Sequence, residues 1–350
     1  MVIGREQSPS DGAKEILSLQ TILSPLAGLF LPASFTGGSR KALTPGYCLI
    51  NPPGLEPLIF SHDLRLGGEF FYRFQLRVSK LSELDQYEKV AATAARNAGK
   101  LLMERFRGHL HVTHKGIINI VTDVDLAAER LIVSHLLEAF PTHHIIAEEN
   151  HSDAKGGSHV WIIDPLDGTT NYAHGLPFFS VSIGLEIEGE IVFGAIYAPA
   201  LDEFFVTRRG KGAYCNGSPI HVSGNASLND SLLATGFPYD IRSGRNTNLD
   251  YFNEFAMCAQ AIRRVGSAAL DLAYLAAGHF DGFWELMLQP WDCAAGMLMI
   301  QEAGGKVSNF RGEPVSIYGR EFLASNGLIH DDMLMILQRI AALKSSPPRR

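Results

Sequence analysis

The chain has no long apolar run and few cysteines. Among its 350 residues no uninterrupted stretch of about 18 apolar side chains occurs, and a membrane-spanning helix needs roughly that length. Its four cysteines lie far apart and form no CxxC pair. This pattern is typical of buried thiols in a reducing compartment rather than of a disulfide framework or a zinc site. We therefore expect a cytoplasmic protein without a membrane span.

An excess of positive charge is also missing. The chain carries 30 Lys and Arg against 37 Asp and Glu, a net charge of -7 at pH 7. Proteins that bind nucleic acid or anionic membranes present a basic face, so neither partner is expected. Hydrophobic residues make up 46% and charged residues 19%, which excludes a disordered chain. The length provides for one large domain or two ordinary ones.

The first 80 residues differ from the rest. Proline and glycine recur there, and no apolar period lasts long enough for a helix or paired strands. We expect residues 1–80 to be a poorly structured extension, either a dispensable arm or the product of a misassigned start. The apolar segment 16–35 contains Gln20, Pro25 and Pro32, so a secretion signal is not expected. The folded domain is predicted over residues 81–343, followed by a flexible tail at 344–350.

The predicted domain begins with two helices and continues with strands and helices. Ser82 with Asp85 resembles a helix N-cap, and Gly108 can end that helix. The segment 188–190 predicts a hairpin turn. Strands are expected at residues 143–147, 161–164, 179–186, 191–198, 203–207, 282–286, 306–308 and 322–325, and further helices at 125–140, 250–261, 267–277, 291–303 and 331–343. This order indicates an α+β fold in layers, with mixed and antiparallel sheets.

Acidic residues stand where predicted elements end or begin. Glu148 and Glu149 follow one strand, Asp164 ends another, and Asp292 opens a helix. Each acid alone is well explained as a cap of a turn or a helix start. Carboxylates brought together repel one another, and each raises the proton affinity of the others. Hard divalent cations with oxygen ligands are the usual compensation, so the set predicts a metal site.

The segment Asp164–Thr170 carries the most specific signal. Asp164 and Asp167 are three residues apart across a proline turn, so both carboxylates and the Leu166 carbonyl can face one ion or a pair of ions. The amides of residues 168–170 can point outward at a helix N-terminus, where phosphate binds well. Cations beside a phosphate site indicate metal-assisted phosphoester hydrolysis.

Several motifs closely resemble the signatures of the inositol monophosphatase family. They are the segment WIIDPLDGTTN at 161–171, Ala-Glu-Glu at 147–149, and Trp-Asp at 291–292 followed by Glu-Ala-Gly-Gly at 302–305. The segments 121–125, 210–217 and 264–269 also match. The resemblance extends from about residue 83 to 341, with every motif in the family order.

The resemblance implies a layered αβαβα sandwich that forms a homodimer. It also implies hydrolysis of small phosphate monoesters with two or three Mg²⁺ ions and inhibition by Li⁺. By motif position, the implied first ion is bound by Glu148, Asp164 and the Leu166 carbonyl, and the second by Asp164, Asp167 and Asp292. Glu149, Asp125 and Thr169 would organise the attacking water or a third ion. Phosphate would be held by Gly168, Thr169 and Thr170, and the alcohol by Gly266, Ser267, Ala268 and Glu285.

Three functions remain open. The first is hydrolysis of myo-inositol 1-phosphate, because Asn171 departs from the Thr-Lys-Glu continuation of the nucleotide phosphatase branch. The second is a broader sugar phosphatase acting on fructose 1,6-bisphosphate or histidinol phosphate, decided by pocket residues such as those at 237–240. The third is a regulatory, protein-binding role, as in some bacterial relatives, although the complete metal set favours retained catalysis.

Histidines and two cations have less specific roles. None of the thirteen histidines forms HExxH or an evident triad, so His109, His111 and His114 are expected on the solvated surface. Lys115 can attract phosphate or simply lie on the surface. Arg264 can pair with a surface acid or reach a partner subunit.

Overall fold

The computed structural model describes residues 67–150, 157–244 and 247–345. Helix α2 (Gly67–Arg105) begins well before the predicted N-cap at Ser82. Its sequence has neither proline nor glycine from residue 69 to 98, so nothing interrupts the helix there. The predicted boundary at residue 80 therefore falls inside α2. Residues 1–66 of the predicted extension, and 346–350 of the predicted tail, lie outside the described residues.

The second helix, α3 (Asp123–Ala139), begins with a capping box. The Thr122 hydroxyl oxygen accepts from the amides of Val124 and Asp125, and the Asp125 carboxylate accepts from the Thr122 amide at 3.0 Å. The helix begins at Asp123, two residues before the predicted start at residue 125. The same Asp125 carboxylate is thus already partly engaged in holding the helix.

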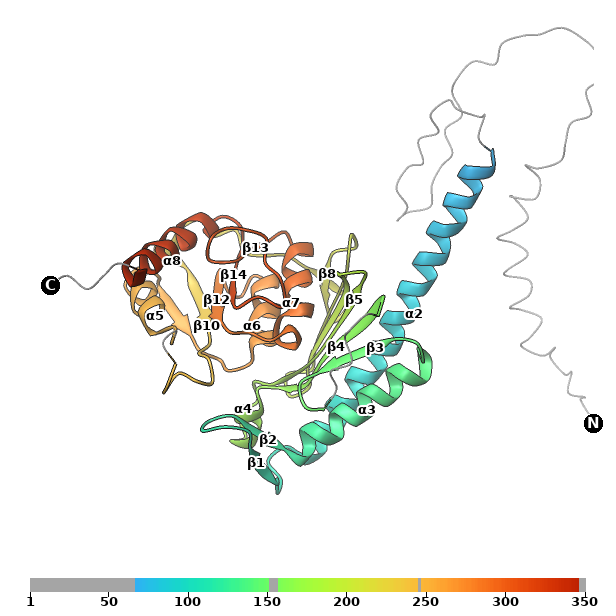
Figure 1. Cartoon of the computed structure of the whole chain (residues 1–350), viewed down its shortest axis with the longest axis horizontal. Helices are drawn as coiled ribbons and strands as arrows, with labels where there is room; N and C mark the ends of the chain where they lie inside the picture. The colour runs from blue at the N-terminus through green and yellow to red at the C-terminus, as the bar shows by residue number, and fades with distance from the viewer. Residues whose placement is uncertain (1–66, 151–156, 245–246, 346–350) are drawn as a thin grey trace, which may run out of the picture. The chain divides into compact units, whose positions relative to one another are not determined.

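Two main sheets organise the remaining chain (Figure 1). The seven-stranded sheet has the order β3-β4-β5-β6-β7-β8-β9, and only β3 and β4 are parallel. The five-stranded sheet has the order β11-β10-β12-β14-β13 and is mixed. A β1–β2 hairpin stands apart from both. The predicted α+β fold with mixed sheets is confirmed.

The bounds of the strands and of the other helices are as follows. The strands are β1 (Val112–His114), β2 (Ile120–Thr122), β3 (His144–Ala147), β4 (His159–Asp167), β5 (Ser180–Ile187), β6 (Glu190–Ala198), β7 (Glu203–Arg208), β8 (Ala213–Cys215), β9 (Ser218–Ile220), β10 (Leu232–Thr235), β11 (Ala261–Arg263), β12 (Gly282–Leu286), β13 (Lys306–Ser308) and β14 (Glu321–Ser325). The helices are α4 (Thr169–Ala173), α5 (Leu249–Ala256), α6 (Ala268–Ala276), α7 (Pro290–Glu302), α8 (His330–Ser345) and the 3-10 turn Leu228–Asp230.

The elements form five layers. Helices α2 and α3 pack against one face of the seven-stranded sheet, and α6 and α7 lie between the two sheets. Helices α5 and α8 cover the outer face of the five-stranded sheet. This arrangement is the predicted αβαβα sandwich, and the carboxyl ends of β4, β10 and β12 lie on the same side as the starts of α6 and α7 (Figure 1).

Glycines allow α7 to approach the seven-stranded sheet closely. A Cβ added at Gly194 on β6 would lie 2.8 Å from the Ala295 Cα and 2.9 Å from its carbonyl oxygen. A Cβ at Gly184 on β5 would lie 3.1 Å from the Ala294 Cβ. Because no side chain separates them, the helix backbone rests almost directly on the strands.

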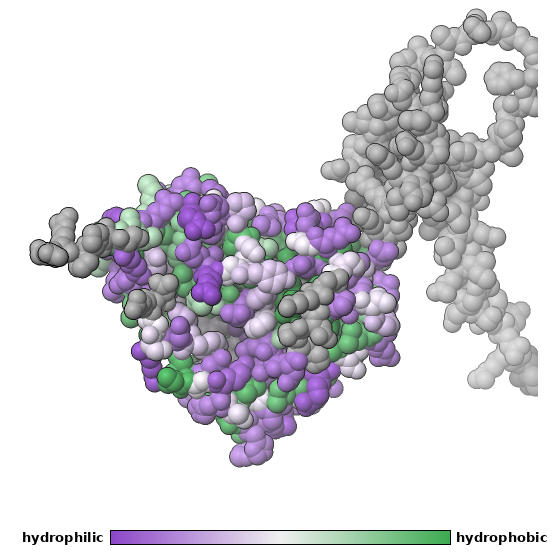
Figure 2. Space-filling model, viewed as in Figure 1, coloured by the Kyte–Doolittle hydropathy of each residue, from purple (hydrophilic) through white to green (hydrophobic). Residues whose placement is uncertain are grey.

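Figure 2 shows a face that is mainly hydrophilic, with apolar residues in scattered patches. Within residues 67–345, apart from the two undescribed gaps, no helix has both the length and the apolarity that a membrane span requires. His109, His111 and His114 are all exposed, as expected.

Candidate active site

A cavity of about 460 Å³ opens where the two sheets meet the starts of α6 and α7. The β1–β2 loop and the residues after β10 both contribute to its walls. Eleven of the predicted site residues line it: Glu148, Asp164, Leu166, Asp167, Gly168, Thr169, Gly266, Ser267, Ala268, Glu285 and Asp292. Thr170 is exposed outside it, and Asp125 and Glu149 lie behind its wall.

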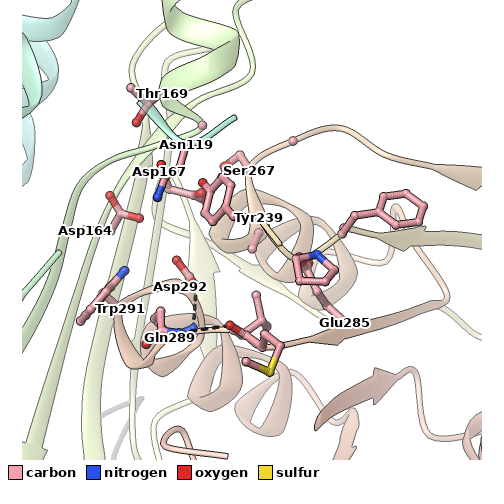
Figure 3. Close-up of a pocket in the computed structure, with 18 of the residues that line it drawn as sticks. Asn119, Asp164, Asp167, Thr169, Tyr239, Ser267, Glu285, Gln289, Trp291 and Asp292 are labelled. Carbon is pink, nitrogen blue, oxygen red and sulfur yellow. Dashed lines mark hydrogen bonds between the residues drawn. The ribbon is translucent and has the colours of Figure 1, made fainter. Parts of the chain in front are cut away.

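Strand β4 continues through the segment that the sequence predicted as a turn. Its pairing with β5 runs from Asp164↔Ser182 to Asp167↔Ser180, so one extra residue is accommodated as a bulge. The Leu166 amide donates to Asp164 Oδ1 at 3.0 Å. A bulge redirects side chains from one face of a sheet, and here it lets Asp164 and Asp167 point into the same cavity (Figure 3).

Gly168 joins this strand to the short helix α4. Its φ is 94°, in the left-handed region, and an added Cβ would lie 2.9 Å from the Phe178 carbonyl oxygen. Only glycine satisfies both conditions without strain. The absence of a side chain at Gly168 therefore lets the Phe178 and Gly266 backbone approach this turn closely.

Buried carboxylates dominate the electrostatics of the cavity. Burial raises the pKa of Asp164 well above its usual range, and repulsion from Glu148, Asp167 and Asp292 raises it further. Burial likewise raises the pKa of Asp292, and Asp167 adds to it. The pKa of Asp167 is raised to about 6 by burial, although hydrogen bonds from Ser267 and the Ala269 amide oppose this. A cation bound here would relieve all three.

Lys115 forms ion pairs with two of the predicted site acids. Its Nζ lies 2.8 Å from Glu148 Oε1 and 2.9 Å from Glu149 Oε1. Of the two interpretations left open, the surface position agrees with the exposure of Lys115, and attraction of phosphate stays a prediction. The ammonium group instead occupies oxygens that an ion would need.

Thr169 and Asp125 are joined as the motif positions imply. The Thr169 hydroxyl lies 2.8 Å from Asp125 Oδ1 and 3.0 Å from the Leu166 carbonyl oxygen. Burial raises the pKa of Asp125 to about 6 despite hydrogen bonds from Thr122 and Thr169. The capping and functional interpretations are therefore compatible, since one oxygen caps α3 and the other faces Thr169.

Glu149 is positioned by a residue that sequence reasoning missed. Glu129, buried in α3, accepts from the amides of Glu149 and Asn150 at 2.9 and 3.3 Å. The pKa of Glu149 is raised to about 7, first by burial and then by Glu148 and Asp125, against the opposing effect of Lys115. A polar residue inside an apolar helix face was the available signal for Glu129.

Ser267 contacts the metal side of the site rather than only the alcohol side. Its hydroxyl donates to Asp167 Oδ2 at 2.7 Å, and the Ala269 amide donates to the same oxygen at 2.7 Å. Ser267 also caps α6. The start of this helix therefore fixes one predicted metal ligand in place.

Glu285 lies at the other end of the cavity from Thr169 (Figure 3). It is 9% exposed, and an added Cβ at Gly236 would lie 2.1 Å from its Oε1. Burial raises its pKa to about 8, which Arg264 opposes and Asp167 reinforces. The absence of a side chain at Gly236 makes room for this carboxylate. Arg264 lines the cavity and has no ion pair among the described residues.

Several lining residues carried no motif signal. Asn119, Asp271, Met287 and Gln289 are among them, and the unplaced candidates at residues 237–240 all line the cavity too. Asp271 Oδ1 is the one buried side-chain oxygen or nitrogen of the described residues without a hydrogen-bond partner. Its position as an acid in the otherwise apolar start of α6 was the signal available.

The donor set fits oxygen-preferring cations by its chemistry. Glu148, Asp164, Asp167 and Asp292 supply carboxylates from three places in the chain. The pKa values of Asp164, Asp167 and Asp292 are raised, so these three lack a compensating charge. In the described part of the chain, no three His, Cys, Asp or Glu side chains are already arranged around an ion. Two of the carboxylates already have partners in the chain. Lys115 forms an ion pair with Glu148, and the Gln289 amide donates to Asp292 at 2.7 Å.

The layered sandwich and its acid-lined cavity define a phosphoric monoester hydrolase. The family model described as the inositol monophosphatase family matches residues 83–342. The chain belongs to this family, which acts on small phosphorylated substrates, and the resemblance noted in the sequence is confirmed.

The similar proteins are named either as Nus factors or as inositol monophosphatases. The chain is 43% identical to the Nus factor SuhB of Pseudomonas aeruginosa over 258 residues, covering 71% of this chain and 94% of that protein. It is 41% identical to an inositol-1-monophosphatase of Mesorhizobium japonicum over 253 residues (71% and 95%). The solved inositol monophosphatase from Anabaena superposes with a TM-score of 0.68 at 41% identity, covering 73% of this chain and 97% of that one.

Proposed function

We propose that this protein hydrolyses myo-inositol 1-phosphate to inositol and phosphate in a Mg²⁺-dependent reaction. The observation that carries the proposal is the shared cavity. It holds four carboxylates, Glu148, Asp164, Asp167 and Asp292, at one end and the separate acceptor Glu285 at the other. Such a cavity suits an anion only when cations reverse the sign of the first group.

The chain would hold two or three ions, and the ligands of two of them are assigned as follows. Glu148, Asp164 and the Leu166 carbonyl would hold one ion, and Asp164, Asp167 and Asp292 a second. When bound, Mg²⁺ would lower the pKa of water and offset the charge that develops on the phosphate and the leaving oxygen. Inhibition by Li⁺ belongs to the same proposal.

Proton movement is assigned to Thr169 and Asp125. The Thr169 hydroxyl donates to Asp125 Oδ1 at 2.8 Å, so its oxygen is left to accept a hydrogen bond from the attacking water. As the water attacks phosphorus, its proton passes to Thr169 and the Thr169 proton to Asp125. The pKa of Asp125 near 6 suits a base at neutral pH. Glu149, close to Asp125, would support this network, and no covalent phosphoenzyme is required.

Binding of the substrate divides between the two ends of the cavity. The amides of Gly168, Thr169 and Thr170 would hold the phosphate, and the exposed side chain of Thr170 takes no part. Gly266, Ser267, Ala268 and Glu285 would line the alcohol site. Cations bound in the site would oppose the rise in the pKa of Glu285 and favour its ionised form. A carboxylate accepts two hydrogen bonds from neighbouring hydroxyls, which suits a polyol ring.

A broader sugar phosphatase is the first alternative. A fructose-1,6-bisphosphatase/inositol-1-monophosphatase of Thermotoga maritima is 39% identical over 246 residues, and histidinol phosphate stays a further candidate. A regulatory role is the second alternative, since relatives are named Nus factor SuhB. A homodimer is part of the proposal, and the cytoplasmic location stays a prediction from the cysteines.

The proposal is tested by phosphate release from purified protein, with Mg²⁺ or with EDTA. The substrates are inositol 1-phosphate, fructose 1,6-bisphosphate, histidinol phosphate and glycerol phosphate. We expect the highest kcat/KM for inositol phosphate and no release in EDTA. A higher value for another sugar would favour the broader phosphatase. No release from any substrate would defeat both enzymatic functions and favour the binding role.

A further inference from the structure

Tyr239 stands on a loop that forms one wall of the cavity. The loop joins β10 to α5, and Tyr239 lines the cavity together with its neighbours Phe237 and Pro238. In Figure 3 its ring projects into the cavity from the side of that loop, toward the region of Asp167 and Ser267. No motif signal identified this residue, and the family signatures quoted above do not include it.

The loop is built to hold this position. The Phe237 ring packs against the Phe252 ring of α5 with centroids 5.7 Å apart. The Asp240 carbonyl oxygen accepts from the amides of Ser243 and Gly244 at 2.9 and 2.6 Å. Phe237, before Tyr239, thus packs on α5, and Asp240, after it, begins a hydrogen-bonded turn. Both contacts limit the positions that the Tyr239 ring can take.

Tyr239 carries an uncommitted hydroxyl donor in the cavity. Four hydroxyl groups line the described cavity. The Thr169 hydroxyl is within reach of Asp125 and Leu166, Ser267 donates to Asp167, and Thr235 donates to the Trp284 carbonyl. The Tyr239 hydroxyl has no partner among the described residues. A phenol is protonated at neutral pH, so it has a proton to donate.

The carboxylates proposed as metal ligands act electrostatically on the Tyr239 hydroxyl. Loss of water around the hydroxyl in the cavity raises its pKa, and the charges of Glu148, Asp292, Asp167 and Asp164 raise it further. The residue as a whole is 60% exposed, and in Figure 3 its ring lies beside Ser267 and Asp167. The hydroxyl therefore lies on the side of the cavity where ions and phosphate would bind.

We propose that Tyr239 contacts the substrate and donates a hydrogen bond from its hydroxyl to a phosphoryl oxygen of the bound monoester. The inference rests on the proposed phosphatase function. A phosphoryl group offers only acceptors, and the other cavity hydroxyls lie against acceptors of the protein. The alcohol, in contrast, offers donors and is served by Glu285, which accepts them. The chemistry of the uncommitted group thus matches the phosphate end.

The test compares Tyr239→Phe with the control Tyr318→Phe. Tyr318 is 57% exposed, and its hydroxyl bonds Glu186 at 3.1 Å, away from the cavity. We measure kcat and KM for inositol 1-phosphate and glycerol phosphate, the inhibition constant of inorganic phosphate with Mg²⁺, and the melting temperature. A hydrogen bond to a charged group predicts about tenfold weaker phosphate inhibition and about tenfold lower kcat/KM.

The expected losses are equal for both substrates in Tyr239→Phe and absent in Tyr318→Phe, with unchanged melting in each. A loss confined to inositol phosphate, with normal inhibition by phosphate, would assign the hydroxyl to the alcohol and overturn the inference. Values within twofold of wild type would also overturn it. If wild type itself releases no phosphate, the proposed function fails instead, and phosphate binding measured by calorimetry with Mg²⁺ still tests the contact.

Discussion

Lys115 Nζ lies 2.8 Å from Glu148 Oε1, so a carboxylate proposed to bind an ion is paired with an ammonium group of the same chain. Lys115 comes from the β1–β2 loop, and Glu148 follows β3. The ion pair and a cation compete for one oxygen. An ion bound through Oε1 would have to displace the ammonium group, which would make Lys115 a determinant of metal affinity.

Lys115→Gln should tighten Mg²⁺ binding. Removal of the ammonium group leaves Glu148 and Glu149 without their partner, and an ion then relieves their repulsion. Partly exposed pairs contribute about 1 kcal/mol or less, so we expect up to about fivefold tighter binding. Calorimetric titration with Mg²⁺ measures it, with Lys306→Gln as control because Lys306 pairs with the distant Asp331 at 2.9 Å. Unchanged or weaker binding in Lys115→Gln would contradict the competition.

Asp164→Asn should abolish turnover while the fold is kept. Asp164 is 1% exposed and is proposed to bridge two ions, so we expect a loss of at least about a thousandfold in kcat. In EDTA the variant should melt at a higher temperature than wild type, because it removes a buried, repelled charge. Asp331→Asn, on the surface, serves as the control for both measurements. Near-normal activity would refute the bridging role.

The metal-free protein should lose stability as pH rises. The pKa of Asp125 and of Asp167 is raised to about 6, of Glu149 to about 7 and of Glu285 to about 8. The folded protein therefore binds more protons than the unfolded chain between about pH 4 and 8, and stability falls over that interval. Melting curves in EDTA at several pH values test this, and Mg²⁺ should flatten the fall. A rise in stability across this pH interval would show that the pKa values of these groups are not raised.

Glu285→Gln should alter the choice of alcohol more than the chemistry. Glu285 lies at the alcohol end, where an amide accepts less well than a carboxylate. We expect kcat/KM for inositol 1-phosphate to fall about tenfold more than that for glycerol phosphate. Steady-state rates on both substrates provide the measurement. Equal losses would mean that Glu285 does not recognise hydroxyl groups.

Gly194→Ala should destabilise the sandwich. The new Cβ would press on the Ala295 backbone at 2.8 Å, and overpacking of this kind costs about 1–3 kcal/mol. Gly224→Ala is the matched control, because nothing lies within 4 Å of its added Cβ. Urea unfolding of both variants measures the difference. Equal stability would mean that α7 can move off the strands at little cost.

The carboxylate cluster could be predicted from the sequence because each acid marks the end of an apolar element. Glu148 follows β3, Asp164 lies near the end of β4, and Asp292 lies in the first turn of α7, so local patterns placed them at the same edge. Glu129 and Asp271 lie within helices, where the sequence does not reveal which buried neighbour a polar group will meet. Tyr239 lies in a loop, and its direction depends on the Phe237 contact with α5.

Most of the long elements were predicted from their periodicity, and of the three-residue strands β13 was predicted but several others were missed. The hairpin at 188–190 forms as expected, with Glu188 and Gly189 at positive φ. Strands β8, β9 and β11 have three residues each, too few to show an alternation. The predicted helix at 250–261 ends at Ala256, because β11 gains backbone pairing with β10 that the helix pattern alone does not indicate.

The acids of the cavity come from both sides of the direct contact between α7 and the seven-stranded sheet. Asp164 and Asp167 end a strand of that sheet, whereas Asp292 is carried by the helix that rests on Gly194 and Gly184. A partly assembled chain, in which this helix has not docked, lacks Asp292, one of the four carboxylates. Cation binding would then measure whether tertiary assembly is complete. A chelator at low concentration would act mainly on the late steps of folding.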